Sequence, residues 1–422
     1  MKTVLLWRNA IKQHGLSILS LLGLVSLLAH VVLQAARSRG LYPGVVGFFE
    51  NADQLLKTGT IGSAFYPPLT TWIVTIIKAL HIPLHPAVFN ACWLLLGTLL
   101  VYTTLFTLTR YRVVAWIGTW FVLLNPYFIW TAMLSNDTGP EWVWLLCVVL
   151  GILLVWKKQD VHLRSATWVI AIGAFASVLT RVTGLFIIGA ILLSAWFFVG
   201  RTVRHRLIPG AISLFIGVMV LCTWNLFQVG SFTPSTNGGI NLYFGNHPAY
   251  LQGHPQYDID GFLGEVSQQD VDSRASEVEQ DRLYRVKGRQ FILNDLTAFI
   301  YRGLVKSEWY WVGFEKIPHY SVPVVLRSDT QTVHLLPLSF QQPLFYMLYR
   351  IACLGFIAWA LLRRAPAVFP HWLIWSGWVG LWPIMVLTFP DTRFRLPLET
   401  LMAMGVVCFV YGFWQQRRGL LQ

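Results

Sequence analysis

A charged stretch, FPDTRFRLP (389–397), opens the last long apolar run of this sequence. The proline at its end disfavours the α-helical region at the preceding residue, so an extended backbone is expected here. Asp391, Arg393 and Arg395 would then share one face, because side chains alternate along an extended chain. Two guanidinium groups can bind a phosphate through bidentate, charge-assisted hydrogen bonds, with Asp391 orienting one of them. The alternative is that the arginines snorkel towards lipid headgroups.

A second polar stretch, SNDTGPEW (135–142), places carboxylates at the start of another apolar run. The spacing Thr138-x-x-Glu141 matches a capping box, in which the glutamate bonds to the backbone at a helix N-terminus. Asp137 would remain available to accept a proton from a hydroxyl group, which is the work of a general base.

A third stretch, GFFENADQLLKTG (47–59), is typical of a short amphipathic helix that ends at Gly59. Glu50 and Asp53 are three residues apart and would lie on the same helix face. Either carboxylate is a second candidate for the base. The alternative is that both belong to the solvated face of a helix at the membrane interface.

Arg181 lies in a tight hairpin, VLTRVTGL (178–185), between two apolar runs. No acidic residue is near it in the sequence. An arginine at a membrane boundary needs a partner, so we expect either an anion or a carboxylate from another loop.

The composition indicates a polytopic membrane protein. The chain has 422 residues, of which 55% are hydrophobic and 12% charged, and its mean hydropathy is +0.56. Soluble domains carry about 25% charged residues. The predicted fold is all-α, with about ten spans long enough to cross a bilayer, at 16–35, 86–108, 112–131, 139–156, 165–180, 183–199, 207–228, 343–362, 371–389 and 397–415.

The positive charge predicts the orientation of these spans. Lys/Arg clusters beyond residue 110 recur after every second span, so they fall on one side, which the positive-inside rule makes cytoplasmic. Both termini are then cytoplasmic, provided that the apolar stretch 66–86 does not cross. The net charge of +13 therefore reports topology, and nucleic-acid binding is not expected.

The predicted organisation has three parts. Residues 229–342 form an extracytoplasmic domain with a helix near 270–305. Histidines in this segment lack the spacing of metal ligands, so no metal site is predicted among them: His247, His254, His319 and His334. The other parts are an N-terminal transmembrane module, 1–228, with catalytic outer loops at 36–85 and 131–141, and C-terminal transmembrane helices, 343–422.

Five stretches, taken in order, resemble GT-C superfamily glycosyltransferases. The similarity is to the branch that includes protein O-mannosyltransferases and bacterial lipid A aminoarabinose transferases, and it extends over nearly the whole chain. The stretches are ENADQLLKTGTIGSAFYPPLTTWI, LLNPYFIWTAMLSNDTGPEW, LTRVTGLFII, GGINLYFGNHPAYLQG and DTRFRLPLETLMA.

The resemblance implies transfer of a sugar from a polyprenyl-phosphate donor to a lipid, glycan or protein acceptor on the outer side of a bacterial inner membrane. An outer-loop carboxylate of such enzymes serves as base, and basic residues hold the lipid phosphate. The family's base is usually an Asp at the position that Val45 occupies here, upstream of Ala52. The base therefore cannot be carried over.

The predicted site contains Asp137, Glu50 and Asp53 as base candidates, and Arg393, Arg395, Arg181 and Asp391 around the donor phosphate. Tyr243, Asn246 and Trp309 are expected to line the substrate site. No cofactor is required by these motifs, and dependence on a divalent metal stays open. Two other functions remain: a transporter or flippase of a lipid-linked substrate, and, because of Val45, a non-catalytic subunit with the same fold.

Overall fold

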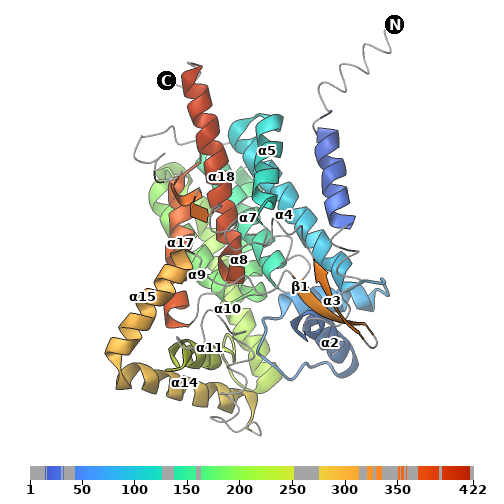
Figure 1. Cartoon of the computed structure of the whole chain (residues 1–422), viewed down its shortest axis with the longest axis vertical. Helices are drawn as coiled ribbons and strands as arrows, with labels where there is room; N and C mark the ends of the chain where they lie inside the picture. Colours follow the sequence, from blue (N-terminus) through green and yellow to red (C-terminus); the bar gives the residue numbers. More distant parts are fainter. Residues whose placement is uncertain are drawn as a thin grey trace.

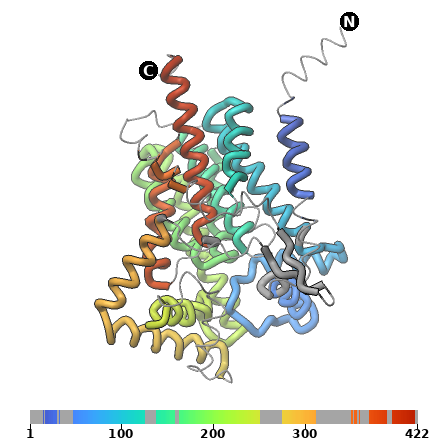
Figure 2. The backbone as a smooth tube through the Cα atoms, viewed as in Figure 1, coloured from blue at the N-terminus to red at the C-terminus, as the bar shows by residue number. Residues whose placement is uncertain are grey.

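The computed structural model describes residues 15, 17–29, 32, 43–125, 137–157, 163–250, 275–312, 321–326, 329–334, 350–351, 353–355, 358, 369–388 and 392–418. Within these ranges the chain is helical apart from loops and one two-stranded sheet. The predicted class, a helical polytopic membrane protein, is confirmed. Figure 2 follows the backbone through these segments.

Apolar helices account for the predicted spans. Every predicted span overlaps one of these helices except 343–362, most of which lies outside the described residues. Within the part of the chain that the structure describes, five helices are long and apolar enough to cross a membrane: Val88–Thr109, Thr138–Trp156, Leu163–Thr180, Arg201–Val229 and Phe394–Arg417. Shorter apolar helices are Ser17–Ala29, Leu69–Ala79, Arg112–Leu123, Thr183–Phe198 and His371–Leu387.

The bounds of the described helices and strands, in chain order, are as follows. They are α2 (Pro43–Thr58), α3 (Leu69–Ala79), α4 (Pro86–Thr109), α5 (Arg112–Leu123), α7 (Thr138–Trp156), α8 (Leu163–Thr180), α9 (Thr183–Phe198), η2 (Arg201–Leu207), α10 (Ile208–Val229), α11 (Gly238–Asn246), α14 (Glu277–Asn294), α15 (Leu296–Val312), β1 (Ser321–Leu326), β2 (Asp329–His334), α17 (His371–Leu387) and α18 (Thr392–Arg417).

Helix α7 lies at the centre of the bundle, with α4, α8 and α18 packed against it (Figure 1). Glycines permit the closest approaches, as in many membrane helix pairs. A Cβ atom on Gly151 would lie 2.9 Å from the carbonyl oxygen of Ala166, and one on Gly173 would lie 3.0 Å from that of Trp144. Side chains at these two positions would separate α7 from α8.

The short helix α3 fits the prediction that 66–86 does not cross. Its 11 residues rise about 16 Å, well short of the roughly 30 Å of a hydrocarbon core. The side chain of Lys78, on α3, fastens it to α2: its Nζ lies 2.7 Å from Asp53 Oδ1 and donates to the carbonyl oxygen of Phe49 at 3.0 Å. As predicted, α2 ends just before Gly59, whose φ is +75°.

Segments that are predicted to lie on the outer side contact one another across long sequence separations. The backbone N–H of Ile61 donates to Gln228 Oε1 at 2.7 Å, and that of Ala64 donates to Glu277 Oε1 at 2.9 Å. Asn237 Nδ2 donates to the carbonyl oxygen of Phe65 at 2.9 Å. Figure 1 shows α2, α3, α11 and α14 at one end of the bundle, opposite the C-terminal end of α18.

The predicted helix near 270–305 is two helices. Helix α14 ends at Asn294, and Asp295 has non-helical backbone angles, φ −147° and ψ 86°. Its Oδ1 accepts the backbone N–H of Ala298 at 2.8 Å, which caps α15. The β1–β2 hairpin, in which Leu326 pairs with Asp329, was not predicted.

The prediction of an extended backbone at the charged stretch before Pro397 is wrong. The backbone before Pro397 is helical, since α18 begins at Thr392 and contains this proline. The proline lies in the second turn, where its missing N–H costs one bond near the helix start. Helix α5 ends at Leu123, and the N–H of Asn125 donates to the carbonyl oxygen of Val122 at 3.1 Å; residues 126–131 of the predicted span lie outside the described residues.

The sidedness of the bundle can be tested by labelling. Thr60 and Arg110 are exposed and flank the stretch that is predicted not to cross. Thr60→Cys should react with an impermeant thiol reagent from the outside, and Arg110→Cys only after the membrane is permeabilised. Arg201→Cys is the matched control for the inner side. Labelling of both positions from one side would overturn the assigned topology.

Candidate active site

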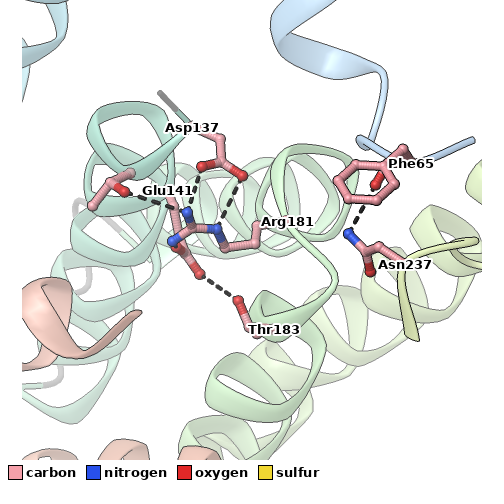
Figure 3. Close-up of polar contacts among 7 residues, drawn as sticks. Phe65, Asp137, Glu141, Arg181, Thr183 and Asn237 are labelled. Atoms are coloured by element: carbon pink, nitrogen blue, oxygen red, sulfur yellow. Dashed lines mark hydrogen bonds and ion pairs between the residues drawn. The ribbon is translucent and has the colours of Figure 1, made fainter. Parts of the chain in front are cut away.

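Two charged clusters lie inside the bundle, and the first joins α7 to the α8–α9 turn. Asp137 immediately precedes α7, and Glu141 is in its first turn. Arg181 lies between α8 and α9, and Thr183 begins α9. The chain thus brings residues 40 and more positions apart to one point, at the predicted outer end of three spans (Figure 3).

The turn that carries Arg181 is tight. The N–H of Arg181 donates to the carbonyl oxygen of Ser177 at 2.9 Å, and the N–H of Gly184 donates to that of Arg181 at 2.9 Å. A Cβ on Gly184 would lie 2.2 Å from Ser177 Oγ and 3.0 Å from the Ser177 carbonyl oxygen. A larger residue at 184 would therefore move the backbone that aims the guanidinium at α7.

The Arg181 guanidinium meets both carboxylates. Its Nε donates to Asp137 Oδ2 at 3.0 Å, its Nη2 contacts Asp137 Oδ1, and its Nη1 donates to Glu141 Oε2 at 2.7 Å. Thr183 Oγ1 donates to Glu141 Oε1 at 3.1 Å. The guanidinium carbon lies 4.8 Å from the centre of the Phe394 ring, which comes from α18.

These charges are shielded from water to different degrees. The side chain of Glu141 is 1% exposed and that of Arg181 8%, whereas that of Asp137 retains 13%. Burial works against the charge of Arg181, but the ionic contacts with Asp137 and Glu141 raise its pKa above the usual value. Arg181 is therefore a fixed cation, and Asp137 is the carboxylate of this cluster with the most access.

The predicted capping box is wrong. Asp137 occupies the N-cap position without a side-chain capping bond, and Glu141 binds Arg181 and Thr183 instead of the helix backbone. The partner that Arg181 needs is supplied by carboxylates of another loop. Its role in holding a donor phosphate stays a prediction, because these contacts occupy Nε, Nη1 and Nη2.

The second cluster surrounds Glu399 in α18. Its Oε1 lies 3.3 Å from Arg350 Nε and 3.5 Å from Arg395 Nε, and its Oε2 accepts Asn125 Nδ2 at 2.6 Å. Arg395 Nη1 also donates to the carbonyl oxygen of Trp309 at 2.9 Å. The Arg350, Arg395 and Glu399 side chains are 0% exposed, so Arg395 does not snorkel to the lipid surface.

Sequence reasoning missed Arg350 and Asn125. Arg350 Nη2 donates to the carbonyl oxygens of Tyr310 and Trp311, each at 2.9 Å, and its guanidinium lies 5.3 Å from the ring centre of Trp378. The available signal for Arg350 was its position near the start of the predicted span 343–362, where an arginine needs a partner. Nothing local in the sequence indicates Asn125 as a ligand of Glu399.

The other charged residues of the predicted site lie away from these two clusters or outside the described residues. Glu50 is exposed on α2, and Asp53 pairs with Lys78. Arg393 belongs to the first turn of α18, but its side chain is outside the described residues, as is the whole of Asp391. Val45 lies in α2. The functional roles of these residues stay predictions.

The predicted substrate-lining residues pack the outer helices together. Tyr243 is fully buried, with its ring centre 5.2 Å from that of Tyr284. Asn246 is also fully buried, and its Nδ2 donates to the carbonyl oxygen of Leu387 at 2.8 Å. Trp309 is half-buried, and its ring centre lies 6.0 Å from that of Tyr250. Their contact with substrate is untested.

Among the residues that the structure describes, no group of three or more His, Cys, Asp or Glu side chains could hold a metal ion. His254 and His319 lie outside these residues. The dependence on a divalent metal is left open.

The buried ion pairs predict a large asymmetry between two arginines. Arg181→Gln leaves Asp137 and Glu141 side by side without their cation, which should lower the free energy of unfolding by about 3–5 kcal/mol. The matched control is Arg282→Gln, which removes a 66% exposed side chain paired with Glu279 and should leave stability unchanged within error. Denaturant or thermal unfolding in detergent measures both. Equal effects would contradict the buried network.

The tight turn predicts different outcomes for two glycines of α9. Gly184→Ala should destabilise the protein by about 1–3 kcal/mol, because its Cβ would overlap Ser177. Gly189→Ala is the control: the nearest atom to its Cβ would be 3.8 Å away, and alanine favours the helix. Unfolding of the two variants under one condition is the measurement, and an innocuous Gly184→Ala would contradict the geometry of the turn.

Comparison with known proteins gives one distant structural relative. No family model matches the chain, and no curated protein matches it. Among solved structures, the chain is similar to the crystal structure of ArnT from Cupriavidus metallidurans bound to undecaprenyl phosphate, with 14% identity and a TM-score of 0.38 over 93% of this chain and 78% of that one. At this distance the likeness assigns neither substrate nor catalytic residues.

Proposed function

We propose that the chain is a membrane glycosyltransferase that moves a sugar from a polyprenyl-phosphate donor to an acceptor hydroxyl. The acceptor is a lipid, glycan or protein, and the reaction takes place on the periplasmic side of a bacterial inner membrane. The proposal rests on the motifs of the sequence together with the arrangement of Asp137 at the bundle's outer end.

The observation that carries the proposal is the Asp137–Arg181 pair. A carboxylate that is held by two contacts from a fixed guanidinium has a defined orientation, and 13% exposure leaves Asp137 within reach of a ligand. Preorganised charge in a water-poor site is the usual basis of electrostatic catalysis. Glu141 and Thr183 hold the guanidinium from its other side, which makes Arg181 a positioning residue.

The transfer step follows from these groups. The acceptor oxygen attacks the anomeric carbon of the sugar, and the bond from that carbon to the donor's phosphate oxygen breaks. The electron pair leaves with the lipid phosphate, and Asp137 takes the proton of the acceptor hydroxyl. General base catalysis of this kind contributes roughly 10²–10⁴-fold.

The start of α18 is the proposed place for the leaving phosphate. Because α18 begins at Thr392, its first turn presents backbone N–H groups and the positive end of the helix dipole. Arg393 belongs to that turn, and Asp391 directly precedes it. Arg395 points inward to Trp309 and Glu399, so we assign it to holding this helix start in place.

A transporter or flippase is the second candidate, and the Glu399 cluster is the observation that favours it. Ionisable side chains buried within spans commonly mark transport pathways. Glu399 and Arg395 are such residues, at 0% exposure in α18. A non-catalytic subunit is the third candidate, because Val45 replaces the residue that the resemblance gives as base.

Transfer of radiolabelled sugar from a polyprenyl-phosphate donor by the purified protein in nanodiscs tests the proposal. Asp137→Asn should lower kcat by about 10²-fold or more, since the amide cannot accept the proton. Asp53→Asn, which loses only an outer ion pair to Lys78, and Glu279→Gln on α14 are the controls and should retain activity.

The outcomes separate the three candidates. Transfer that needs Asp137 supports the glycosyltransferase. Movement of labelled lipid between leaflets without transfer would assign a flippase, and neither activity would favour the non-catalytic subunit. Normal kcat in Asp137→Asn would show that the base lies elsewhere, and loss of kcat in Asp53→Asn would move it to α2.

A further inference from the structure

Helix α15 carries two basic side chains on its buried side. Arg302 and Lys306 are one helical turn apart and are 5% and 0% exposed. No ion pair joins either of them to a carboxylate in the part of the chain that the structure describes. Buried cations without paired anions are rare because desolvation of a charge is costly.

Lys306 has an identifiable structural contact. Its Nζ donates to the carbonyl oxygen of Val386 at 3.0 Å, in the last turn of α17, and lies 5.3 Å from the ring centre of Tyr250. Carbonyl groups at a helix C-terminus attract a cation. These contacts place the ammonium group between α15, α17 and the segment that follows α11.

Arg302 has no such partner. Its Nε and Nη2 are buried and make no hydrogen bond within the described residues. Asp295, at the start of α15, acts on Arg302 only through its charge. An unsatisfied buried donor costs free energy, and the cost is larger when the donor is charged. An anion that accepted these two N–H groups would remove the cost.

The charge of Arg302 also changes the pKa of Lys306. Burial, and then the charge of Arg302, lower the pKa of Lys306 to about 7. An anion between the two groups would reverse both influences by neutralising Arg302 and favouring the charged ammonium.

The opposite side of α15 is apolar and open. Leu296, Ile300 and Leu304 recur at helical spacing and are 56%, 60% and 65% exposed. Figure 1 shows α15 at the edge of the molecule, beside α17. In a membrane protein, an apolar stripe of this kind is compatible with the boundary between headgroups and acyl chains.

We propose that Arg302 and Lys306 bind the phosphate of an anionic bilayer phospholipid, whose headgroup reaches round the edge of α15 to its buried side while the acyl chains stay on the side of the apolar stripe. The guanidinium supplies the planar pair of donors Nε and Nη2, which matches two phosphate oxygens, and the ammonium supplies a second charge. The peripheral position of α15 favours a bilayer lipid over the donor, whose phosphate must lie near the carboxylates of the bundle.

This site is independent of the proposed transferase activity. It needs no reaction, and a transporter or a non-catalytic subunit would carry it equally well. Its loss would be seen in lipid binding and stability, whereas failure of the transferase would be seen in turnover.

Native mass spectrometry of the delipidated protein tests the proposal, with phosphatidylglycerol, a polyprenyl phosphate and inorganic phosphate as separate probes. Phosphatidylglycerol should bind the wild type, and Arg302→Gln should weaken that binding about tenfold or more. Arg282→Gln removes the same charge from the exposed face of α14 and should leave binding unchanged. Arg302→Lys keeps the charge but loses the planar fork, so it should bind weakly.

Thermal unfolding gives a readout that does not depend on detecting the lipid. Without lipid, Arg302→Met should be at least as stable as the wild type, because it removes an unsatisfied buried charge. Added phosphatidylglycerol should stabilise the wild type and leave Arg302→Met unaffected. If Arg302→Met does not fold, the Arg302→Lys variant carries the same comparison.

Three results would overturn the proposal. Equal phosphatidylglycerol binding by the wild type and Arg302→Gln would show that the pair is not the site. Preferential binding of polyprenyl phosphate through Arg302 would assign the pair to the donor instead. If inorganic phosphate bound as tightly as the lipid, the site would hold an adventitious ion only, and the apolar stripe of α15 would contribute nothing to binding.

Discussion

The ionic contact of Arg181 with Asp137 and Glu141 is the constraint on which the rest of the bundle depends. An arginine side chain that is only 8% exposed requires anions in place of water. The anions come from the start of α7, so the α8–α9 turn must lie against α7 whatever the other helices do. The glycines that let α7 and α8 approach, such as Gly173, meet the same requirement further along the two helices.

The first turns of α18 connect this contact to the second charged cluster. Phe394 lies over the guanidinium of Arg181, while its neighbour Arg395 reaches to Trp309 and Glu399. Adjacent residues on one helix thus touch the α8–α9 turn on one side and α15 on the other. A displacement of the start of α18 would disturb both clusters together. The outer helices and the proposed carboxylate are therefore mechanically linked through one helical turn.

Features with local signals were predictable from the sequence. The apolar runs and the end of α2 at Gly59 follow from hydropathy and from a glycine that tolerates positive φ. Features that depend on contacts between residues far apart in the sequence could not be predicted. The capping-box spacing of Glu141 is a valid local signal, but a buried arginine from another loop competes for the same carboxylate and binds it more strongly than a backbone N–H would. The rule that proline disfavours helical backbone at the preceding residue failed at Pro397, because α18 continues through that residue and loses one backbone hydrogen bond near its start.

The buried cations differ in what balances them, and this decides which of them the protein alone can explain. Arg181 has two carboxylates, Arg395 has Glu399 and a backbone carbonyl oxygen, and Lys306 has a carbonyl oxygen of α17. Each of these arrangements is complete enough to hold a charge in a poorly hydrated interior. Arg302 has a distant acid and no acceptor in the described part of the chain. The sequence does not reveal this difference, because the groups that balance these four cations come from other helices and loops, apart from Glu399. The difference appears only once the helices are packed, and it adds the inner face of α15, as a proposed lipid-phosphate site, to the start of α18 proposed for the donor.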